Sequence, residues 1–188
     1  MLIGQLLKPF GYLAIKHPYK WVVDWLYPFL LSLITITFIV SLSTAKLLIL
    51  PGGMISMILS FVQSLPGFYI AALAAIATFG RLDIDDILPE PTPKVVVKLR
   101  GLENTIDLTR RRFLAMLFAF LTGESIAIVF FCIALLSFGP AIDDFTHSQV
   151  PIGHYLLIVA LFCLFTSVYQ MLLATFWGLY YLGYKLQE

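Results

Sequence analysis

Charged residues are scarce in this chain of 188 residues. Lys, Arg, Asp and Glu make up 12% of it, whereas hydrophobic residues make up 60%. A typical soluble domain is about 25% charged and about 45–50% apolar. A surface with so little charge would aggregate in water, so we expect lipid to be the main solvent of the chain. The formal net charge of +1 gives no reason to expect direct binding of nucleic acid.

Cysteines and catalytic motifs are also sparse. The two cysteines, Cys132 and Cys163, lie inside apolar runs without the Cys/His spacing of a metal site, and we expect both to be small buried hydrophobic residues. The GxSxG, P-loop and HExxH patterns are absent from the sequence. We therefore predict no catalytic residue, no metal and no other cofactor, and a protein that is not an enzyme. The N-terminal lysines and prolines, with no cleavage site of small residues, argue against a removable signal peptide.

Long apolar runs make up most of the sequence. A helix crosses the hydrocarbon core of a bilayer with about 20 apolar residues. Four runs reach that length, at residues 21–42, 54–79, 113 to about 138, and about 152 to 184. Short connections join the first run to the second and the third to the fourth. We predict an all-α integral membrane protein with four transmembrane helices in two antiparallel hairpins, the second helix loosened at Pro66 and Gly67.

The segment between the second and third runs, residues 80–112, holds most of the charge. Its acidic, proline-rich part, DIDDILPEPTP, is expected to be an extended tether without a core of its own. Apolar and polar residues then alternate with the period of a strand, which predicts a small cytosolic β-hairpin that turns around residues 101–104. The chain accordingly divides into an amphipathic N-terminus with the first transmembrane hairpin (1–79), the linker and β-hairpin (80–112), and the second transmembrane hairpin with the C-terminal end (113–188).

Basic residues are distributed unevenly between the two sides of the predicted bundle. All lysines and arginines but one lie before the first run, in the middle segment or after the last run, and the exception is Lys46. Short cytoplasmic loops of membrane proteins carry an excess of Lys and Arg. This pattern places both termini and the middle segment in the cytoplasm, with the chain as a multi-pass protein of a bacterial inner membrane.

The middle segment is the best candidate for a functional surface. An isolated two-stranded hairpin is marginal in water, so a partner surface is expected, and a cytosolic protein could dock by edge pairing and charge complementarity. The predicted partner-binding residues are Lys94, Lys98, Arg100 and Asp107. The arginines that follow are better explained as a membrane anchor in contact with anionic lipid, and with the interfacial tryptophans the predicted anchor residues are Arg110, Arg111, Arg112, Trp21 and Trp25.

Polar residues inside the apolar runs form a second set of candidates: Glu124, Gln63 and Gln170. Glu124 lies near the middle of the third run, where a charged group is costly. Two interpretations stay open. The residue is an ion or proton site or a membrane-sensing switch, or it makes an interhelical contact with Gln63, Gln170, Tyr169 or a second copy of itself.

Three other features have simpler interpretations. Asp24, close to the start of the first run, is expected to reach the headgroup region. His154 lies near His147 and two aspartates, but the spacing matches no known set of metal ligands. Small residues at helical spacing in the second run favour close helix packing, within the chain or between chains, and they are Gly67, Ala71, Ala74 and Ala75.

The layout of two hydrophobic hairpins around the insert KVVVKLRGLENTIDLTRRRF resembles the KwaA family, the membrane subunits of Kiwa antiphage defence systems. The resemblance covers the whole chain in plan. It implies a homo-oligomer, a tetramer, that senses phage attachment or injection and works with a KwaB-like cytosolic effector that binds DNA. The expected function is therefore a membrane sensor or scaffold that recruits this effector through the middle segment. The alternative is a small oligomeric pore or holin-like protein.

Overall fold

The computed structural model describes residues 4–5, 7–42, 44–78, 80, 82–99, 102–145 and 152–180. Helices account for most of these residues, and a single pair of strands lies between the second and third long helices. In chain order the elements are the 3₁₀-helix η1 Lys8–Ala14, the π-helix η2 Val22–Leu26, the α-helices α2 Tyr27–Ser41, α3 Ala45–Leu48, α4 Met54–Val62 and α5 Leu65–Thr78, the 3₁₀-helix η3 Leu82–Asp85, the strands β1 Lys94–Leu99 and β2 Leu102–Asp107, and the α-helices α6 Arg110–Asp143 and α7 Ile152–Tyr180.

Four helical segments within this described part of the chain are long and apolar enough to cross a membrane: Val22–Ser41, Met54–Thr78, Arg110–Asp143 and Ile152–Tyr180. They match the four predicted runs, and their length and composition indicate a multi-pass membrane protein. Two prolines shape the spans. Pro66 lies in the first turn of α5, where a missing N–H is tolerated, and the second span is accordingly divided into α4 and α5. Pro28 is the second residue of α2, which follows the π-helical turn of η2 directly.

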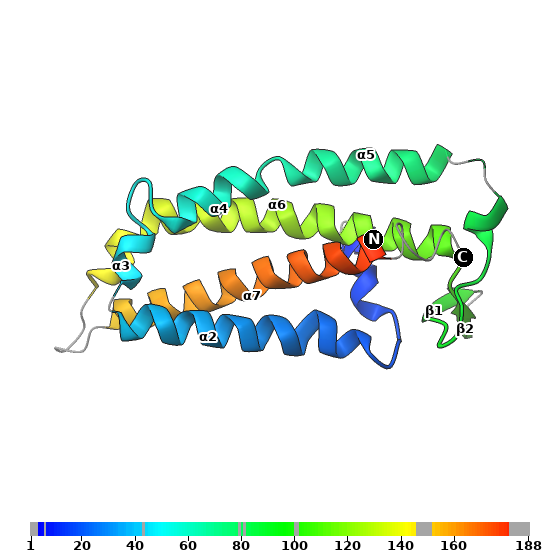
Figure 1. Cartoon of the computed structure of the whole chain (residues 1–188), viewed down its shortest axis with the longest axis horizontal. Helices are drawn as coiled ribbons and strands as arrows, with labels where there is room; N and C mark the ends of the chain where they lie inside the picture. Colours follow the sequence, from blue (N-terminus) through cyan, green and yellow to red (C-terminus); the bar gives the residue numbers. More distant parts are fainter. Residues whose placement is uncertain are drawn as a thin grey trace.

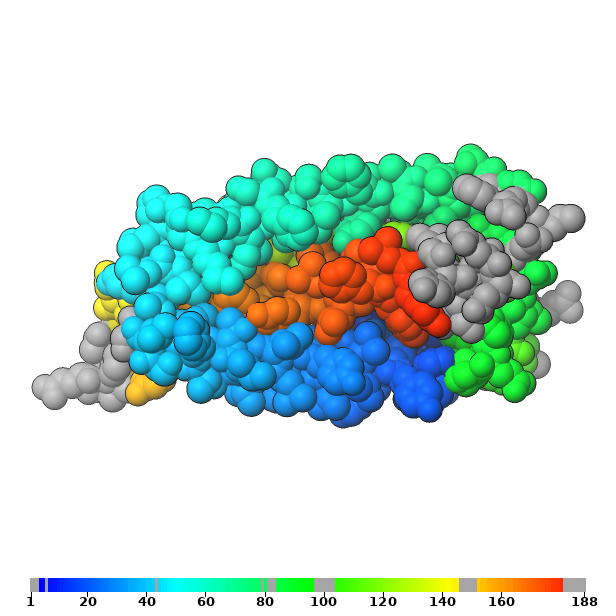
Figure 2. All heavy atoms as spheres, in the orientation of Figure 1, coloured from blue at the N-terminus to red at the C-terminus, as the bar shows by residue number. Residues whose placement is uncertain are grey.

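The long helices pack side by side in the order α2, α7, α6 and then α4 with α5 (Figure 1). Helices α6 and α7 pack directly against each other, as expected for the second hairpin. The two spans that were expected to form the first hairpin do not share such a contact surface, because α2 packs on α7 and α5 packs on α6. Figure 2 shows α7 lying between α2 on one side and the α4–α5 span on the other.

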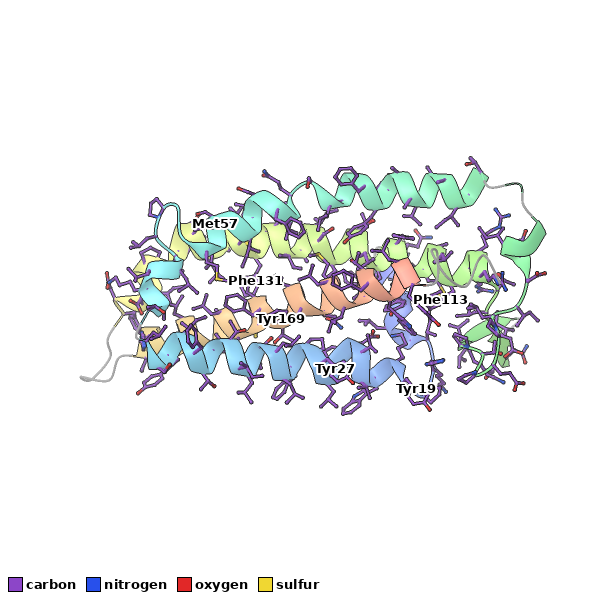
Figure 3. All side chains as sticks on the ribbon, in the orientation of Figure 1. Tyr19, Tyr27, Met57, Phe113, Phe131 and Tyr169 are labelled. Carbon is purple, nitrogen blue, oxygen red and sulfur yellow. The ribbon has the colours of Figure 1, made fainter. Side chains whose placement is uncertain are left out.

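One end of the bundle carries the strands, the beginnings of α2 and α6, and the ends of α5 and α7 (Figure 1). We call it the hairpin end, and the opposite end, at α3, the far end. The N-terminal segment folds into the bundle at the hairpin end, where η1 packs on α6. The Tyr12 ring is fully buried and stacks on Phe120 with ring centroids 5.0 Å apart. Phe113 and Trp177 meet edge to face nearby, at 5.5 Å (Figure 3).

The predicted antiparallel pair of strands is confirmed, but the predicted turn at residues 101–104 is wrong, because β2 already begins at Leu102. Strands β1 and β2 pair antiparallel, with Lys94 opposite Asp107 and Leu99 opposite Leu102. The acidic segment before it is not the free tether that its composition predicts, because Ile84 and Leu88 are buried. Burial of these two apolar side chains offsets the entropic cost of ordering the segment. The Leu88 N–H also donates to the Leu108 carbonyl at 3.1 Å.

Candidate functional site

The strands and the segment that leads into them form a unit that we call the hairpin module, residues 82–109. Arg111, at the start of α6, fastens this module to the spanning helices. Its guanidinium donates to both carboxylate oxygens of Asp85, at 2.7 and 3.0 Å, and to the carbonyl of Ile76 near the end of α5, at 2.9 Å. Two hydrogen bonds from one guanidinium to one carboxylate fix the relative orientation of the two groups as well as their distance. The same hydrogen bonds hold the pKa of the Asp85 carboxyl below its ordinary value.

Backbone pairing fastens the module at two further points. Lys16 and Lys94 form an antiparallel bridge with N···O distances of 2.8 and 3.0 Å, so the N-terminal segment extends the edge of β1. On the other side, the Arg110 N–H donates to the Asp86 carbonyl at 3.0 Å. The module is therefore held by the N-terminal segment and by the start of α6 together.

The predicted partner-binding residues are only partly brought together. Lys94 and Asp107 face each other across the strand pair and form an ion pair at 3.4 Å, with both side chains about half exposed. Exposed pairs of this kind contribute little to stability, so both charges remain available to a partner. Lys98 lies in β1 opposite Glu103. Arg100 lies outside the described residues.

A cavity of about 810 Å³ lies beside the Lys16–Lys94 pairing and is lined by residues of the N-terminal segment, of the start of the first span and of the hairpin module. Basic and aromatic side chains line much of it, together with one acid of the linker, and the lining includes Lys16, His17, Trp21, Trp25, Glu90 and Lys94. Partial burial lowers the pKa of His17, against the raising effect of its contact with the backbone of Pro91.

The predicted anchor residues differ in their surroundings. Trp21 and Trp25 are 63% and 47% exposed at the start of the first span, as expected for rings at the membrane interface. Arg111 instead makes the internal contacts described above. The Nε of Arg110 is buried without a hydrogen-bond partner among the described residues. The backbone N–H of Arg112 donates to the Thr109 side chain, which caps α6.

The position of Asp24 predicts an exposed interfacial residue, but its side chain is buried inside the protein. Its carboxylate is buried and forms an ion pair with buried Lys20, and it also accepts a hydrogen bond from the Tyr12 hydroxyl at 3.2 Å. The Lys20 ammonium lies 4.0 Å from the centroid of the Tyr12 ring. The spacing of Lys20 and Asp24, four residues apart on a helix, indicates such a pair. The sequence gives no signal that Tyr12 contacts this ion pair, because Tyr12 lies in η1 and not in the helix that carries Lys20 and Asp24.

Glu124 and Gln170 line one cavity of about 370 Å³ between η1, α6 and α7. Both are buried, and the Glu124 Oε2 and Gln170 Nε2 atoms lack hydrogen-bond partners among the described residues. The other predicted contacts of Glu124 are placed elsewhere. Gln63 is exposed at the end of α4. The Tyr169 hydroxyl lies 2.8 Å from Thr35 Oγ1, on the α2 side of α7 (Figure 3).

Polar residues at the far end form a separate cluster. His154 Nδ1 lies 2.9 Å from Asp143, and the Lys46 ammonium lies 2.8 Å from Asp144 and 3.7 Å from Asp143. Within the described ranges, no group of three or more His, Cys, Asp and Glu side chains could hold a metal ion. His147 lies outside those ranges. Cys132 is buried as predicted, whereas Cys163 is exposed on the surface of the bundle.

Comparison of the chain with models of known protein families, with curated proteins and with solved structures gives no match.

Proposed function

We propose that the protein is a non-enzymatic scaffold or sensor of a bacterial inner membrane, which recruits a soluble cytosolic protein through the hairpin module. The attachment of the module to the spanning helices carries this proposal. Arg111 binds Asp85, and Lys16 pairs with Lys94. A protein bound to the module is therefore held in a fixed orientation relative to the membrane helices. The excess of Lys and Arg at the hairpin end supports a cytosolic module and cytosolic termini.

The outer edge of β1 supports recognition by strand addition. Lys94 exchanges both backbone hydrogen bonds with Lys16, and alternate residues of an antiparallel strand turn their backbone groups the same way. The backbone N–H and C=O groups of Val96 and Lys98 therefore point to the same outer edge of β1 at which Lys16 pairs with Lys94. The N-terminal chain turns away into η1 at Ala14, which leaves this edge for another strand. An extended acidic segment fits best, because Lys94 and Lys98 lie along this strand.

The resemblance to the KwaA family gives this role a biological setting. There the recruited protein is a KwaB-like, DNA-binding effector, and the membrane subunit is a homo-oligomer that responds to phage attachment or injection. The outer face of α5 supports self-association. Gly67, Ala71, Ala74 and Ala75 are exposed on it, and an added Cβ at Gly67 would meet nothing within 4 Å. Small residues allow the backbone of a second transmembrane helix to approach closely.

Site-specific photo-crosslinking in cells tests the recruitment. A photoreactive amino acid at position 98 should form a covalent adduct with a soluble protein. Val96→Pro removes the N–H that an added strand needs but leaves the β1–β2 pairing in place, because proline is tolerated at sheet edges. The adduct should be lost in Val96→Pro. A photoreactive residue at position 46, at the far end, is the matched control and should give no such adduct.

An adduct of equal yield in Val96→Pro would overturn edge recognition. The absence of any soluble adduct at position 98, in cells that carry the native genomic neighbourhood, would overturn recruitment itself. The same strains test the alternative, a small oligomeric pore, which the polar Glu124 cavity favours. Rapid loss of membrane potential on induction of this protein alone would support the pore, and an unchanged potential supports the scaffold.

A further inference from the structure

Two lysines face each other where the N-terminal segment joins the hairpin module. Lys16 and Lys94 exchange both of their backbone hydrogen bonds. Directly opposed residues of an antiparallel pair carry their side chains on the same face, with Cα atoms about 5.5 Å apart. Like charges in such positions destabilise the pairing. The junction therefore carries an electrostatic cost that a bound anion would relieve.

Among the described residues, ion pairing balances one of these two lysines. Asp107 lies opposite Lys94 in β2, and its carboxylate is 3.4 Å from the Lys94 ammonium. Lys16 is exposed and has no ion-pair partner within the described part of the chain. The neighbouring buried pair of Lys20 and Asp24 is neutral as a unit. One uncompensated positive charge therefore remains at Lys16.

Both lysines line the cavity of about 810 Å³ beside their pairing. Trp21 and Trp25 line the same cavity and are exposed at the start of the first span, where tryptophan rings lie among lipid headgroups. Thr105 of β2 adds a hydroxyl group to the lining. The volume is within the range of about 300–1,000 Å³ that small-molecule sites occupy. The cavity thus brings a free positive charge to the membrane interface.

We propose that this cavity binds the phosphodiester headgroup of an anionic phospholipid such as phosphatidylglycerol. The phosphate oxygens accept hydrogen bonds from the ammonium groups of Lys16 and Lys94. The single negative charge of the phosphodiester balances the charge that remains at Lys16. The glycerol backbone of the lipid lies against Trp21 and Trp25. The proposal requires no recruited protein, and it holds whichever side of the membrane carries the hairpin module.

Glu90 provides a test of charge within the same cavity. It belongs to the linker, and its exposed side chain is part of the cavity lining. A carboxylate repels a phosphate, so Glu90→Gln should strengthen the binding of phosphatidylglycerol. Lys16→Gln should weaken it, because the ammonium that attracts the phosphate is removed. Weaker binding of phosphatidylglycerol in Glu90→Gln would contradict the proposal.

Three probes separate the parts of the lipid. Phosphatidylglycerol is compared with diacylglycerol of the same acyl chains, which lacks the phosphate, and with glycerophosphoglycerol, which lacks the acyl chains. Native mass spectrometry of the full chain in a non-ionic detergent measures the binding of each probe. Phosphatidylglycerol should bind with one molecule per chain. It should bind at least about fivefold more tightly than diacylglycerol, the factor that one lysine beside an anionic lipid provides.

A matched pair of variants locates the site. Lys16→Gln keeps the backbone pairing with Lys94, and it should weaken phosphatidylglycerol by about fivefold without changing diacylglycerol. Lys8→Gln removes the same charge from an exposed lysine outside the cavity lining. It should change the binding of phosphatidylglycerol by less than about twofold, because charges beyond direct contact are screened by salt.

Equal affinity of the unmodified chain for phosphatidylglycerol and diacylglycerol would overturn the proposal. Equal losses in Lys16→Gln and Lys8→Gln would do the same, because the lipid would then be attracted by the overall charge. Glycerophosphoglycerol that binds as tightly as phosphatidylglycerol would assign the cavity to a soluble phosphodiester and overturn the lipid. Crosslinking at position 98 tests recruitment separately, so failure of one proposal leaves the other standing.

Discussion

Lys16 and Lys94 exchange two backbone hydrogen bonds, with N···O distances of 2.8 and 3.0 Å, although they are separated by the whole first pair of spanning helices. The N-terminal segment thereby becomes the neighbour of the first strand of the hairpin module. Its preceding helix, η1, contributes Phe10 and Leu13 to the Glu124 cavity. A single short segment therefore contacts both the intramembrane cavity and the surface that we propose for recruitment.

The first prediction concerns this pairing. Lys16→Pro removes the N–H that donates to the Lys94 carbonyl, whereas Lys16→Ala keeps it. Hydrogen exchange of the backbone amide of Lys94 should become at least several-fold faster in Lys16→Pro and stay close to the unmodified rate in Lys16→Ala. Equal rates in the two variants would show that the pairing does not hold the module.

The second prediction concerns the buried pair of Lys20 and Asp24. Lys20→Met leaves the Asp24 carboxylate buried without a counter-charge, and the free energy of unfolding should fall by about 3–5 kcal/mol. The double variant Lys20→Met with Asp24→Leu should recover most of this loss, because it removes both charges. Thermal unfolding in detergent provides the measurement, and Lys8→Met, at an exposed lysine, is the control. A double variant as unstable as Lys20→Met would contradict the pairing.

The third prediction concerns the close approach of α6 and α7 at the far end. A Cβ added at Gly153 would lie 1.6 Å from the carbonyl oxygen of Ile142, so the backbones must separate. Gly153→Ala should therefore lower the free energy of unfolding by about 1–3 kcal/mol. Gly4→Ala, at an exposed glycine where an added Cβ meets nothing within 4 Å, is the control, and it should be neutral or stabilising by up to about 1 kcal/mol. Equal thermal stability of the two variants would refute the close packing.

Much of this architecture follows from local patterns in the sequence. The four spans, the division of the second span near Pro66 and the alternation in β1 and β2 each depend on residues close together in the chain. The packing order of the helices does not follow from such patterns. Apolar residues occur on every face of the spans, so no polar stripe in the sequence indicates which face of a span packs against which neighbour.

Non-local contacts explain the remaining differences. Asp24 is buried because Tyr12 reaches it from η1, and composition alone cannot show that this segment folds back into the bundle. The sequence neighbours of Arg111 favour a lipid contact, whereas its partner Asp85 lies in a linker whose composition predicts no attachment to the helices. Polarity within an apolar run identifies both Gln170 and Glu124 as candidates, but only the packing of α6 on α7 shows that they line the same cavity.

The fourth prediction is a pH dependence of the attachment of the module. Arg111 holds the pKa of Asp85 below its ordinary value of 3.8. A carboxyl with a lowered pKa in the folded state stabilises that state above its ordinary pKa, and the contribution is lost as the pH falls through the lowered value. Amide protection of residues 84–88, corrected for intrinsic exchange, should be constant from about pH 7 to about pH 5 and should fall below about pH 4.

Asp85→Asn provides the control for this prediction. The amide does not titrate, so residues 84–88 should be less protected in this variant at pH 7. The decrease in their amide protection near pH 4, which we attribute to Asp85, should also be absent in this variant. A decrease of the same size in Asp85→Asn would assign the pH dependence to another group.

The most direct test of the account is the side of the membrane on which the hairpin module lies. With Cys132 and Cys163 replaced by serine, Lys98→Cys is treated with a membrane-impermeant maleimide in intact spheroplasts and again after lysis. Asp144→Cys, at the exposed far end, is the control for outside access. The account predicts labelling of Lys98→Cys only after lysis and of Asp144→Cys before it. Labelling of Lys98→Cys in intact spheroplasts would contradict recruitment of a cytosolic protein by this module.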